Sequence, residues 1–339
     1  MPNPSSGRMR QRLLWRCGLV ILGLLLGPVL HVQNVDSADR TGAVKIGVLT
    51  QSWGATPQTV GLRDGLLALG YREGEQFVIG VRFTQGDPAA LPAAARELIE
   101  SGVDVIFASD VNAARAAQGF TRKIPIVFAG VLNDPVELGL VQSFARPGGN
   151  ITGVSDGDLN LAGKRLEIFK EMVPGLKRVL FLYNSSDPYT VAAARAYRDG
   201  ARHLGLVLVE KPVRTEEQAR TTLATLRKGE VDGIVAPPTT SLNIAGVILD
   251  ATSERAIPTM FNGAFFVERG ALVSYGADWY ESGRQAARLV DKVLKGEDPG
   301  RIPVEANPKV ELVINVKVAK ALKLAIPASV LQRANRLIE

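Results

Sequence analysis

The chain has 339 residues, of which 46% are hydrophobic and 22% are charged, and its mean hydropathy is close to zero. These values are those of an ordinary globular protein that is long enough for two domains. The formal net charge of +6 would suit a nucleic-acid-binding protein, but the position of the basic residues argues against that class.

Four arginines precede an apolar run of 12 residues, Leu19–Leu30. A basic segment followed by a short apolar run is typical of a secretory signal and is too short for a comfortable membrane span. Cleavage after Ala38 would remove four arginines and Asp36, leaving 36 basic and 33 acidic residues, or +3. We therefore predict a signal peptide over residues 1–38 and an exported, periplasmic or otherwise extracytoplasmic protein with no nucleic-acid partner. Because Asp36 occupies a position where a small residue is expected, an uncleaved leader that anchors the protein stays open.

Cysteine and histidine are scarce. Cys17 is the only cysteine, and His203 is the only histidine outside the predicted leader. A lipidated cysteine would follow the apolar run, whereas Cys17 precedes it. The exported part must then be stabilised by a hydrophobic core rather than by disulfides. We predict no metal site, because a Cys/His site needs more ligands than these. We also predict no cofactor, because no dinucleotide-binding fingerprint follows the first predicted strand.

Short apolar runs alternate with helical patterns in the first half of the chain, which is typical of βαβ units and a parallel sheet. The predicted strands cover residues 44–50, 77–83, 103–109 and 124–130, and the predicted helices cover 58–69, a segment beginning near Pro88, and 111–120. Residues 144–158 are predicted as a crossover.

The same order restarts at residue 177. The second set of predicted strands covers 177–184, 206–213, 231–238, 257–263 and a fifth from 271, with helices over 189–203, 216–227 and 279–295. Two short sequences recur in order: VDVI at 103 matches VDGI at 231, and IPIVFAG at 124 matches IPTMFNG at 257. The fold class is therefore predicted as α/β, with two Rossmann-like lobes over 44–150 and 151–300. Part of residues 300–339 is expected to return to the first lobe.

Ligands of open α/β sheets bind beyond the carboxyl ends of the strands. The candidate ligand-binding residues that follow the predicted strands are Ser52, Trp53, Ser109, Asp110, Asn133, Asp156, Asn184, Asp187, Thr239, Phe261, Asn262 and Tyr275. Hydroxyls and helix N-termini suit a carboxylate, Asp and Asn suit an ammonium or hydroxyl, and aromatic rings suit an apolar part. This mixture favours a small polar, amino-acid-like solute. Ser109, Asp110, Asp187 and Thr239 could equally be helix N-caps.

Two further patterns bear on function. GVSDG (153–157) matches a nucleophile elbow, and Asp187 and His203 follow Ser155 in hydrolase order, but no helical pattern follows directly. We predict that the protein is not an enzyme, with an exported hydrolase using Ser155 or a ligand-sensing module of a signalling system as alternatives. In ALVSYGADWYESGR (271–284), Asp278 and Glu281 form a capping-box pattern, which indicates a helix start.

Several stretches resemble a known family. They are GLRDGLLALGYREGEQFVIGVRF, IPIVFAGVLNDPVELGLVQSFARPGGNITGVS, GALVSYGAD and the C-terminal PVEANPKVELVINVKVAKALKLAIPASVLQRANRLIE. Over residues 44–339 the chain resembles solute-binding proteins of ABC importers, in the branch related to tryptophan and aromatic-amino-acid binders. The resemblance implies a type I-like periplasmic-binding-protein fold that closes on its ligand by hinge motion. It also implies a permease and an ATPase as partners, and ligand contacts at Ser52, Asp156, Asn184 and Asn262.

Overall fold

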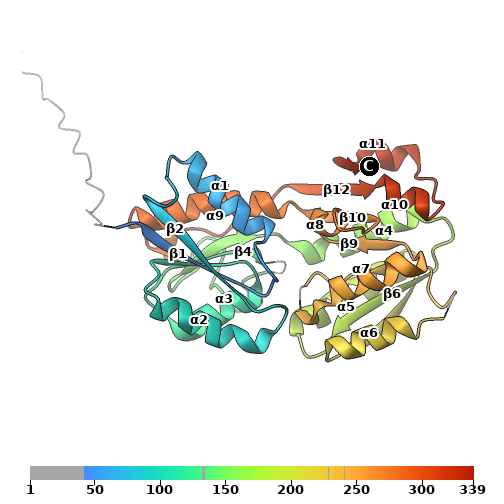
Figure 1. Cartoon of the computed structure of the whole chain (residues 1–339), viewed down its shortest axis with the longest axis horizontal. Helices are drawn as coiled ribbons and strands as arrows, with labels where there is room; N and C mark the ends of the chain where they lie inside the picture. Colours follow the sequence, from blue (N-terminus) through green and yellow to red (C-terminus); the bar gives the residue numbers. More distant parts are fainter. Residues whose placement is uncertain (1–41, 132–133, 228, 240) are drawn as a thin grey trace, which may run out of the picture. The chain divides into compact units, whose positions relative to one another are not determined.

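The computed structural model of the chain describes residues 42–131, 134–227, 229–239 and 241–339, which form two β-sheets covered by helices (Figure 1). The predicted signal peptide over 1–38 lies outside the described residues. Within the described part of the chain, no helix is both long enough and apolar enough to cross a membrane.

The first sheet has the strand order β11-β5-β4-β3-β1-β2, and all its paired strands are parallel. Its strands are β1 (Val44–Thr50), β2 (Phe77–Phe83), β3 (Val105–Ala108), β4 (Ile126–Val131), β5 (Ile151–Ser155) and β11 (Glu305–Ala306). The helices beside it are α1 (Pro57–Ala68), η1 (Pro88–Ala90), α2 (Leu91–Glu100), α3 (Val111–Phe120), α9 (Trp279–Leu294) and η4 (Pro299–Arg301). We call this sheet with its helices the first lobe.

The second sheet has the order β13-β12-β10-β9-β8-β6-β7, with β10 and β12 antiparallel. Its strands are β6 (Arg178–Asn184), β7 (Val207–Val213), β8 (Gly233–Val235), β9 (Thr259–Phe261), β10 (Val273–Ala277), β12 (Val310–Asn315) and β13 (Arg336–Ile338). Its helices are η2 (Asp158–Leu161), α4 (Ala162–Met172), α5 (Pro188–His203), α6 (Glu216–Ala224), η3 (Ser241–Asn243), α7 (Ile244–Arg255), α8 (Ala264–Val267), α10 (Val316–Ala321) and α11 (Ala328–Arg333). This sheet and its helices form the second lobe.

The sequence repeat is a repeat of topology. The order β2-β1-β3-β4-β5 of the first lobe recurs as β7-β6-β8-β9-β10 in the second. The recurring aspartate has the same role in both: Asp104 Oδ2 accepts the backbone N–H of Lys45 at 2.8 Å, and Asp232 Oδ2 accepts that of Arg178 at 2.8 Å. Each aspartate therefore ties the beginning of the third strand to the beginning of the first.

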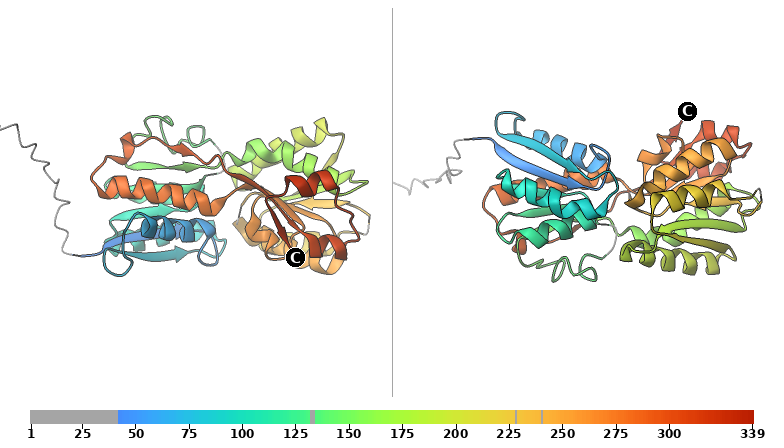
Figure 2. Two further views of the ribbon diagram at one scale, coloured as in Figure 1. Left: turned by 90° about the horizontal axis from the view of Figure 1, so that it is seen from above. Right: turned by 60° about the horizontal axis from the view of Figure 1, so that its bottom comes forward.

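Both faces of each sheet are covered by helices, as the two views in Figure 2 show. Successive side chains of a strand point to opposite faces of the sheet. A fully buried strand therefore contributes side chains to a hydrophobic core on each face. In β3, Ile106 and Ala108 join the cluster that includes Leu98 and Ala114, whereas Phe107 joins the cluster on the other face. This explains why the central strands read as continuous apolar runs.

The predicted boundary between the lobes at residue 150 differs from the structure. Residues 151–155, expected in a crossover, form β5 and pair with β4 in the first sheet. The segment reads as a turn because it is rich in glycine, but Gly153 is required here for packing: a Cβ at that position would lie 2.4 Å from the Phe128 ring. The strand is thus determined by tertiary contact rather than by local pattern.

Helix α9, assigned by sequence to the second lobe, packs against α1 of the first lobe. Glycines let the two backbones touch: a Cβ on Gly61 would lie 2.0 Å from the carbonyl oxygen of Tyr280, and one on Gly283 would lie 2.0 Å from that of Gln58. Of residues 300–339, η4 and β11 lie in the first lobe, while β12 and β13 extend the second sheet. The chain therefore passes between the lobes after β5, after β10 and after β11.

Candidate functional site

A cavity of about 440 Å³ lies where the carboxyl ends of strands from both lobes meet. It is lined by residues that follow β1 and β3 in the first lobe and β8 in the second, together with the first turns of α1, α3, α5 and α7. In each sheet the strand order reverses between the first and third strands, and ligands of doubly wound sheets bind at this reversal. The volume is within the range of small-molecule sites.

Aromatic side chains form much of the cavity wall. They are Trp53, Tyr189, Phe265, Phe266 and Trp279. The Trp53 ring lies over Gly86, where a Cβ would come within 2.6 Å of it, and the rings of Phe266 and Trp279 meet edge to face at 6.0 Å. These walls offer flat apolar surface from both lobes, which suits an aromatic or otherwise apolar part of a ligand.

Five buried polar atoms of the lining residues have no hydrogen-bond partner among the residues that the structure describes. They are Gln51 Nε2, Gln58 Oε1, Ser109 Oγ, Tyr189 Oη and Trp279 Nε1. A buried polar group without a partner costs about 1–3 kcal/mol, so a cluster of five in one cavity needs an explanation. Four of the five can donate a hydrogen bond, which is the complement of a ligand rich in acceptors, such as a carboxylate.

Among the described lining residues, Asp110 is the only carboxylate and Arg269 is the only cation. Asp110 caps α3, with Oδ1 accepting from the N–H of Ala113 at 2.8 Å and Oδ2 from that of Gln51 at 3.1 Å. Burial raises the pKa of the Asp110 carboxyl, and the charge of Asp187 raises it further. The Arg269 guanidinium lies 3.4 Å from the centre of the Phe265 ring and donates to the Phe265 carbonyl at 3.0 Å. The two charges come from different lobes.

Five of the residues proposed from the sequence line this cavity: Ser52, Trp53, Ser109, Asp110 and Thr239. Asp110 is also the N-cap of α3, which was the alternative role expected for it. Asn133 lies outside the described residues.

The other proposed residues of the second lobe have partners within that lobe. Asn184 donates from Nδ2 to Ser241 Oγ at 3.0 Å and accepts at Oδ1 from the N–H of Ser186. Asp187 caps α5 by accepting from the N–H of Tyr189 at 2.9 Å. These two side chains shape the loops that carry the lining residues and are not themselves part of the lining.

Phe261, Asn262 and Tyr275 also lie away from the cavity lining. Phe261 is fully buried, and its ring packs at 4.8 Å from that of Phe266, which is the ring that reaches the cavity. Asn262 is buried against Gly276, where a Cβ would lie 1.9 Å from the Asn262 carbonyl oxygen. The Tyr275 ring packs on the core of the second lobe. Phe261 and Asn262 lie deeper than the lining because α8 follows β9 and covers its end, whereas Tyr275 lies in the middle of β10 rather than at its end. Asp156, the remaining proposed residue, lies at the first passage between the lobes.

Gln58, Phe265, Arg269 and Trp279 line the cavity but were not proposed from the sequence as ligand contacts. Gln58 and Trp279 stand in the first turns of α1 and α9. The predicted helix start at Asp278 is confirmed, since its Oδ1 accepts from the N–H of Glu281 at 3.1 Å. Counting the first helical turn as well as the loop before it would have found both residues, whereas no local pattern marks Arg269.

The hydrolase alternative does not fit this geometry. Asp187 and His203 stand at opposite ends of the 16-residue helix α5, which is roughly 24 Å long at 1.5 Å per residue. Ser155 is a buried residue at the end of β5. A triad needs all three groups within hydrogen-bond reach, so these residues cannot form one.

A model of the family described as ABC transporter substrate binding protein matches residues 44–338. The chain belongs to this family. It is 31% identical over 257 residues to a tyrosine-binding protein of Clostridioides difficile, covering 75% of this chain and 73% of that protein. The family is one of substrate-binding proteins rather than enzymes, in agreement with the expectation from the resemblance.

Solved structures show the same fold. The ABC domain from Streptococcus pneumoniae in complex with L-Trp is 27% identical, with a TM-score of 0.78 over 88% of this chain and 100% of that one. A conserved domain protein from Vibrio cholerae is 30% identical, with a TM-score of 0.77 over 87% of this chain and 99% of that one. The predicted two-lobed α/β periplasmic-binding-protein fold is confirmed.

Proposed function

We propose that this substrate-binding protein captures an aromatic amino acid of the tyrosine or tryptophan type. The observation that carries the proposal is the combination in one cavity of aromatic walls with five buried polar atoms that lack partners. An apolar ligand would leave those polar atoms unsatisfied, and a sugar would make poor use of the aromatic walls on both sides. Two relatives, a tyrosine-binding protein and a domain solved in complex with L-Trp, support the same class.

The charges of the cavity suit the ammonium and carboxylate groups that an amino acid carries on its α-carbon. The Asp110 carboxylate is desolvated and accepts only backbone N–H groups, so an ammonium group would be a favourable partner for it. Arg269 is free to pair with a carboxylate, and the donors of Ser109 and Tyr189 can contribute further hydrogen bonds. The ligand would then contact both lobes, and such bridging stabilises a closed state.

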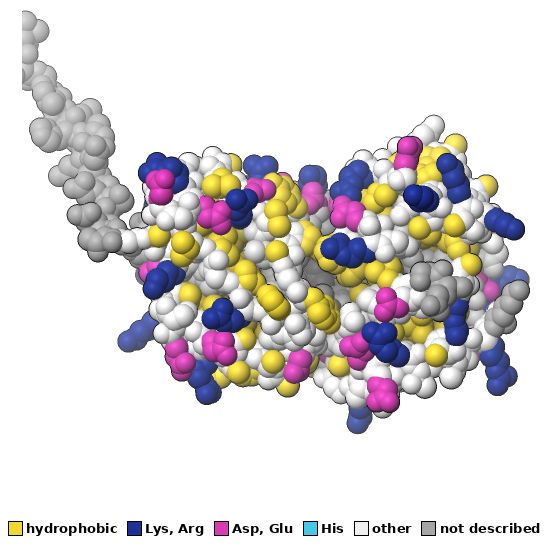
Figure 3. Space-filling view, in the orientation of Figure 1, with side chains coloured by type: hydrophobic (Ala, Val, Ile, Leu, Met, Phe, Trp, Pro, Cys, Tyr) yellow, Lys and Arg dark blue, Asp and Glu magenta, His cyan; other side chains and the backbone are white. Residues whose placement is uncertain are grey.

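We further propose that the protein works outside the cytoplasm after export by its leader and passes its solute to an ABC permease with a cytoplasmic ATPase. On the face shown in Figure 3, basic and acidic side chains are interspersed. A surface without a single-sign patch on that face gives no support to nucleic acid as a partner.

The proposal is tested by isothermal titration of refolded protein, freed of any carried-over solute, with a panel of ligands. The panel contains L-tyrosine, L-tryptophan, L-leucine, L-glutamate, glucose and uridine. We expect saturable 1:1 binding of at least one aromatic amino acid, without chemical change of the ligand, and weaker or no binding of the others. Binding of glucose or uridine with no response to either aromatic amino acid would overturn the proposal.

A further inference from the structure

The first passage between the lobes runs through Asp156-Gly157-Asp158, in which two buried carboxylates flank a glycine. Asp156 and Asp158 are 6% and 0% exposed. Burying a carboxylate is costly unless it is well hydrogen-bonded or paired. Two such residues separated by one position therefore indicate that each has a specific partner set.

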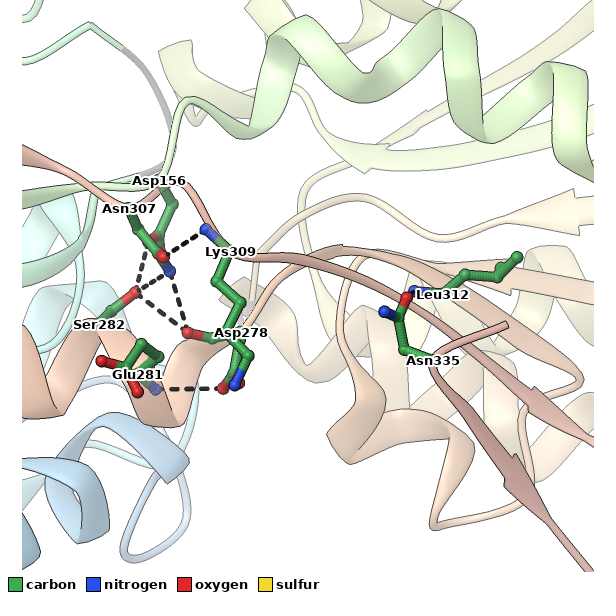
Figure 4. Close-up of polar contacts among 8 residues, drawn as sticks. All are labelled: Asp156, Asp278, Glu281, Ser282, Asn307, Lys309, Leu312 and Asn335. Atoms are coloured by element: carbon green, nitrogen blue, oxygen red, sulfur yellow. Dashed lines mark hydrogen bonds and ion pairs between the residues drawn. The ribbon is translucent and has the colours of Figure 1, made fainter. Parts of the chain in front are cut away.

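Asp156 is bonded on the side of the first lobe. Its Oδ1 accepts from Ser282 Oγ at 2.5 Å and from Asn307 Nδ2 at 3.3 Å. Ser282 belongs to α9, which follows the second passage, and Asn307 belongs to the third passage. Asn307 Nδ2 also donates to Ser282 Oγ at 2.8 Å and to the carbonyl of Asp278 at 3.0 Å (Figure 4). One cluster thus joins all three passages at their first-lobe end.

Asp158 is bonded within the second lobe. It forms an ion pair with Arg165 of α4, and both side chains are fully buried. Arg165 in turn donates to Tyr197 Oη of α5 at 3.1 Å and to the carbonyl of Tyr275 in β10 at 2.6 Å. Breaking a buried ion pair on one side costs about 3–5 kcal/mol, so Asp158 is firmly attached to the second lobe.

Gly157 lies between these two attachments and has left-handed backbone angles, with φ 57° and ψ 29°. A Cβ added there would meet only Asn160 Nδ2, at 3.7 Å, so the surrounding space is open. Glycine reaches both left- and right-handed regions at little cost, whereas other residues do not. Position 157 therefore favours glycine because of its backbone conformation, and not because a side chain would clash there.

We propose that Gly157 is the pivot of the first passage. When the lobes move, its backbone angles change while Asp156 stays bonded to the first lobe and Asp158 to the second. Hinges of this kind absorb a large dihedral change in a few residues. The motif that resembled a nucleophile elbow therefore serves motion. Its effect on solute affinity rests on the proposed function, but the pivot itself does not.

The attachment of Asp156 is also sensitive to pH. Burial raises the pKa of its carboxyl to about 7, the hydrogen bonds from Ser282 and Asn307 act in the opposite direction, and the charges of Asp158 and Asp278 raise it. Asp278 is itself paired with Lys309 at 2.7 Å. Within the described part of the chain, Asp156 Oδ2 is buried and accepts no hydrogen bond, so a proton can be placed there.

The pivot is tested by distance measurements between the lobes. In a full-length Cys17→Ser background, Glu100→Cys in α2 and Glu217→Cys in α6 provide exposed sites for spin labels. Double electron–electron resonance then gives the distance distribution, without ligand and with saturating L-tyrosine or L-tryptophan. Gly157→Ala and Gly157→Val are compared with Gly163→Ala, a control at a position where a Cβ meets nothing within 4 Å and φ is not left-handed.

We expect Gly157→Val to shift the distribution away from the distance seen in wild type, because a β-branched side chain disfavours left-handed angles. The population ratio should change roughly tenfold, with a smaller change for Gly157→Ala. Gly163→Ala should match wild type. Distributions of both Gly157 variants identical to wild type would overturn the pivot. If wild type binds neither amino acid, the proposed function fails. The ligand-free distance distributions of the Gly157 variants still test whether Gly157 is the pivot.

Discussion

The two lobes share a strand order but contribute different chemistry to the cavity. The first lobe supplies polar groups, among them Gln51, Ser109 and Asp110, from the loops directly after its strands. The second supplies mainly Tyr189, the rings of Phe265 and Phe266, and Arg269. A repeated fold therefore does not imply a repeated site. The first lobe offers a carboxylate beside Trp53 and Trp279, whereas the second offers a cation beside Tyr189, Phe265 and Phe266.

The difference between the side chains that the two lobes present to the cavity arises from α8. This short helix follows β9 directly and holds Phe265 and Phe266 in front of the strand ends, so that Phe261 becomes core. Arg269 follows the same helix. Helix α9 adds Trp279 at its start while packing on the first lobe, which places an aromatic residue beside the passage between lobes.

The largest expected effect concerns the buried ion pair of the second lobe. Arg165→Met would leave the Asp158 carboxylate buried without a cation, and we expect a loss of about 3–5 kcal/mol in the free energy of unfolding. Urea denaturation measures this. Lys164→Met on the same helix, which removes an exposed pair with Glu167, is the control and should change little. Equal effects of the two variants would refute the anchoring role of Asp158.

Next comes the pH dependence of stability at the passage between the lobes. Because the pKa of Asp156 is raised to about 7 in the folded protein, its protonated form is favoured by folding. Its contribution to stability is fully present below its unfolded pKa of about 4 and is lost as the pH rises through 7, by up to about 4 kcal/mol.

Asp156→Asn removes that titration. The difference in unfolding free energy between wild type and Asp156→Asn should therefore fall steadily from pH 4 to pH 7 and then level off. Urea denaturation across this range provides the measurement. A difference that does not vary with pH would show that Asp156 keeps an ordinary pKa.

The division of charge between the lobes can be tested with ligand analogues. Arg269→Met should weaken L-tyrosine binding roughly tenfold to a hundredfold, as expected for losing a charged hydrogen bond, but leave tyramine, which has no carboxylate, unaffected. Asp110→Asn, which keeps the helix cap, should weaken both compounds. It should spare 3-(4-hydroxyphenyl)propionate, which has no ammonium. Titration calorimetry of wild type and both variants with the three compounds gives nine affinities. Equal losses for all three compounds in either variant would show that the substituted side chain does not pair with the charged group assigned to it.

The smallest expected effect concerns the aspartate that both lobes carry just before their third strand. Asp104→Ala removes the tie between β3 and β1, and Asp232→Ala removes the matching tie between β8 and β6. We expect each to lower the free energy of unfolding by about 1 kcal/mol. The loss should be somewhat larger for Asp232, which also accepts from the Arg178 guanidinium at 2.9 Å. Thermal unfolding, with Glu100→Ala as an exposed control, would reveal whether either tie is dispensable.

The local sequence pattern predicts where helices and strands lie better than it predicts which other elements they pack against. The limits of β1 and β2 match the sequence prediction, because alternating and continuous apolar runs are local signals. β5 was missed because Gly153 reads as a turn residue, although it is needed for contact with Phe128. The helical pattern over 279–295 could not show that α9 packs on the first lobe, since helix–helix contact through Gly61 and Gly283 is a tertiary feature.

The sequence also predicts the cavity-lining residues of one lobe better than those of the other. The strand-end rule found Ser52, Trp53, Ser109 and Asp110 in the first lobe, where short loops lead directly from strand to helix. In the second lobe it found only Thr239, because the depth of a residue below the cavity floor depends on what packs above it. Asn262 follows β9 as expected, but it is buried beneath α8. Tyr275 lies in the middle of β10 rather than at its end, and its ring packs on the core of the second lobe.

The most direct test is a crystal structure of the protein grown with L-tyrosine or L-tryptophan. We expect the amino acid in the cavity between the lobes, with its ring against the aromatic walls, its ammonium at Asp110 and its carboxylate at Arg269. Electron density for the amino acid outside this cavity, or a cavity occupied instead by a solute without an aromatic ring, would contradict the assignment.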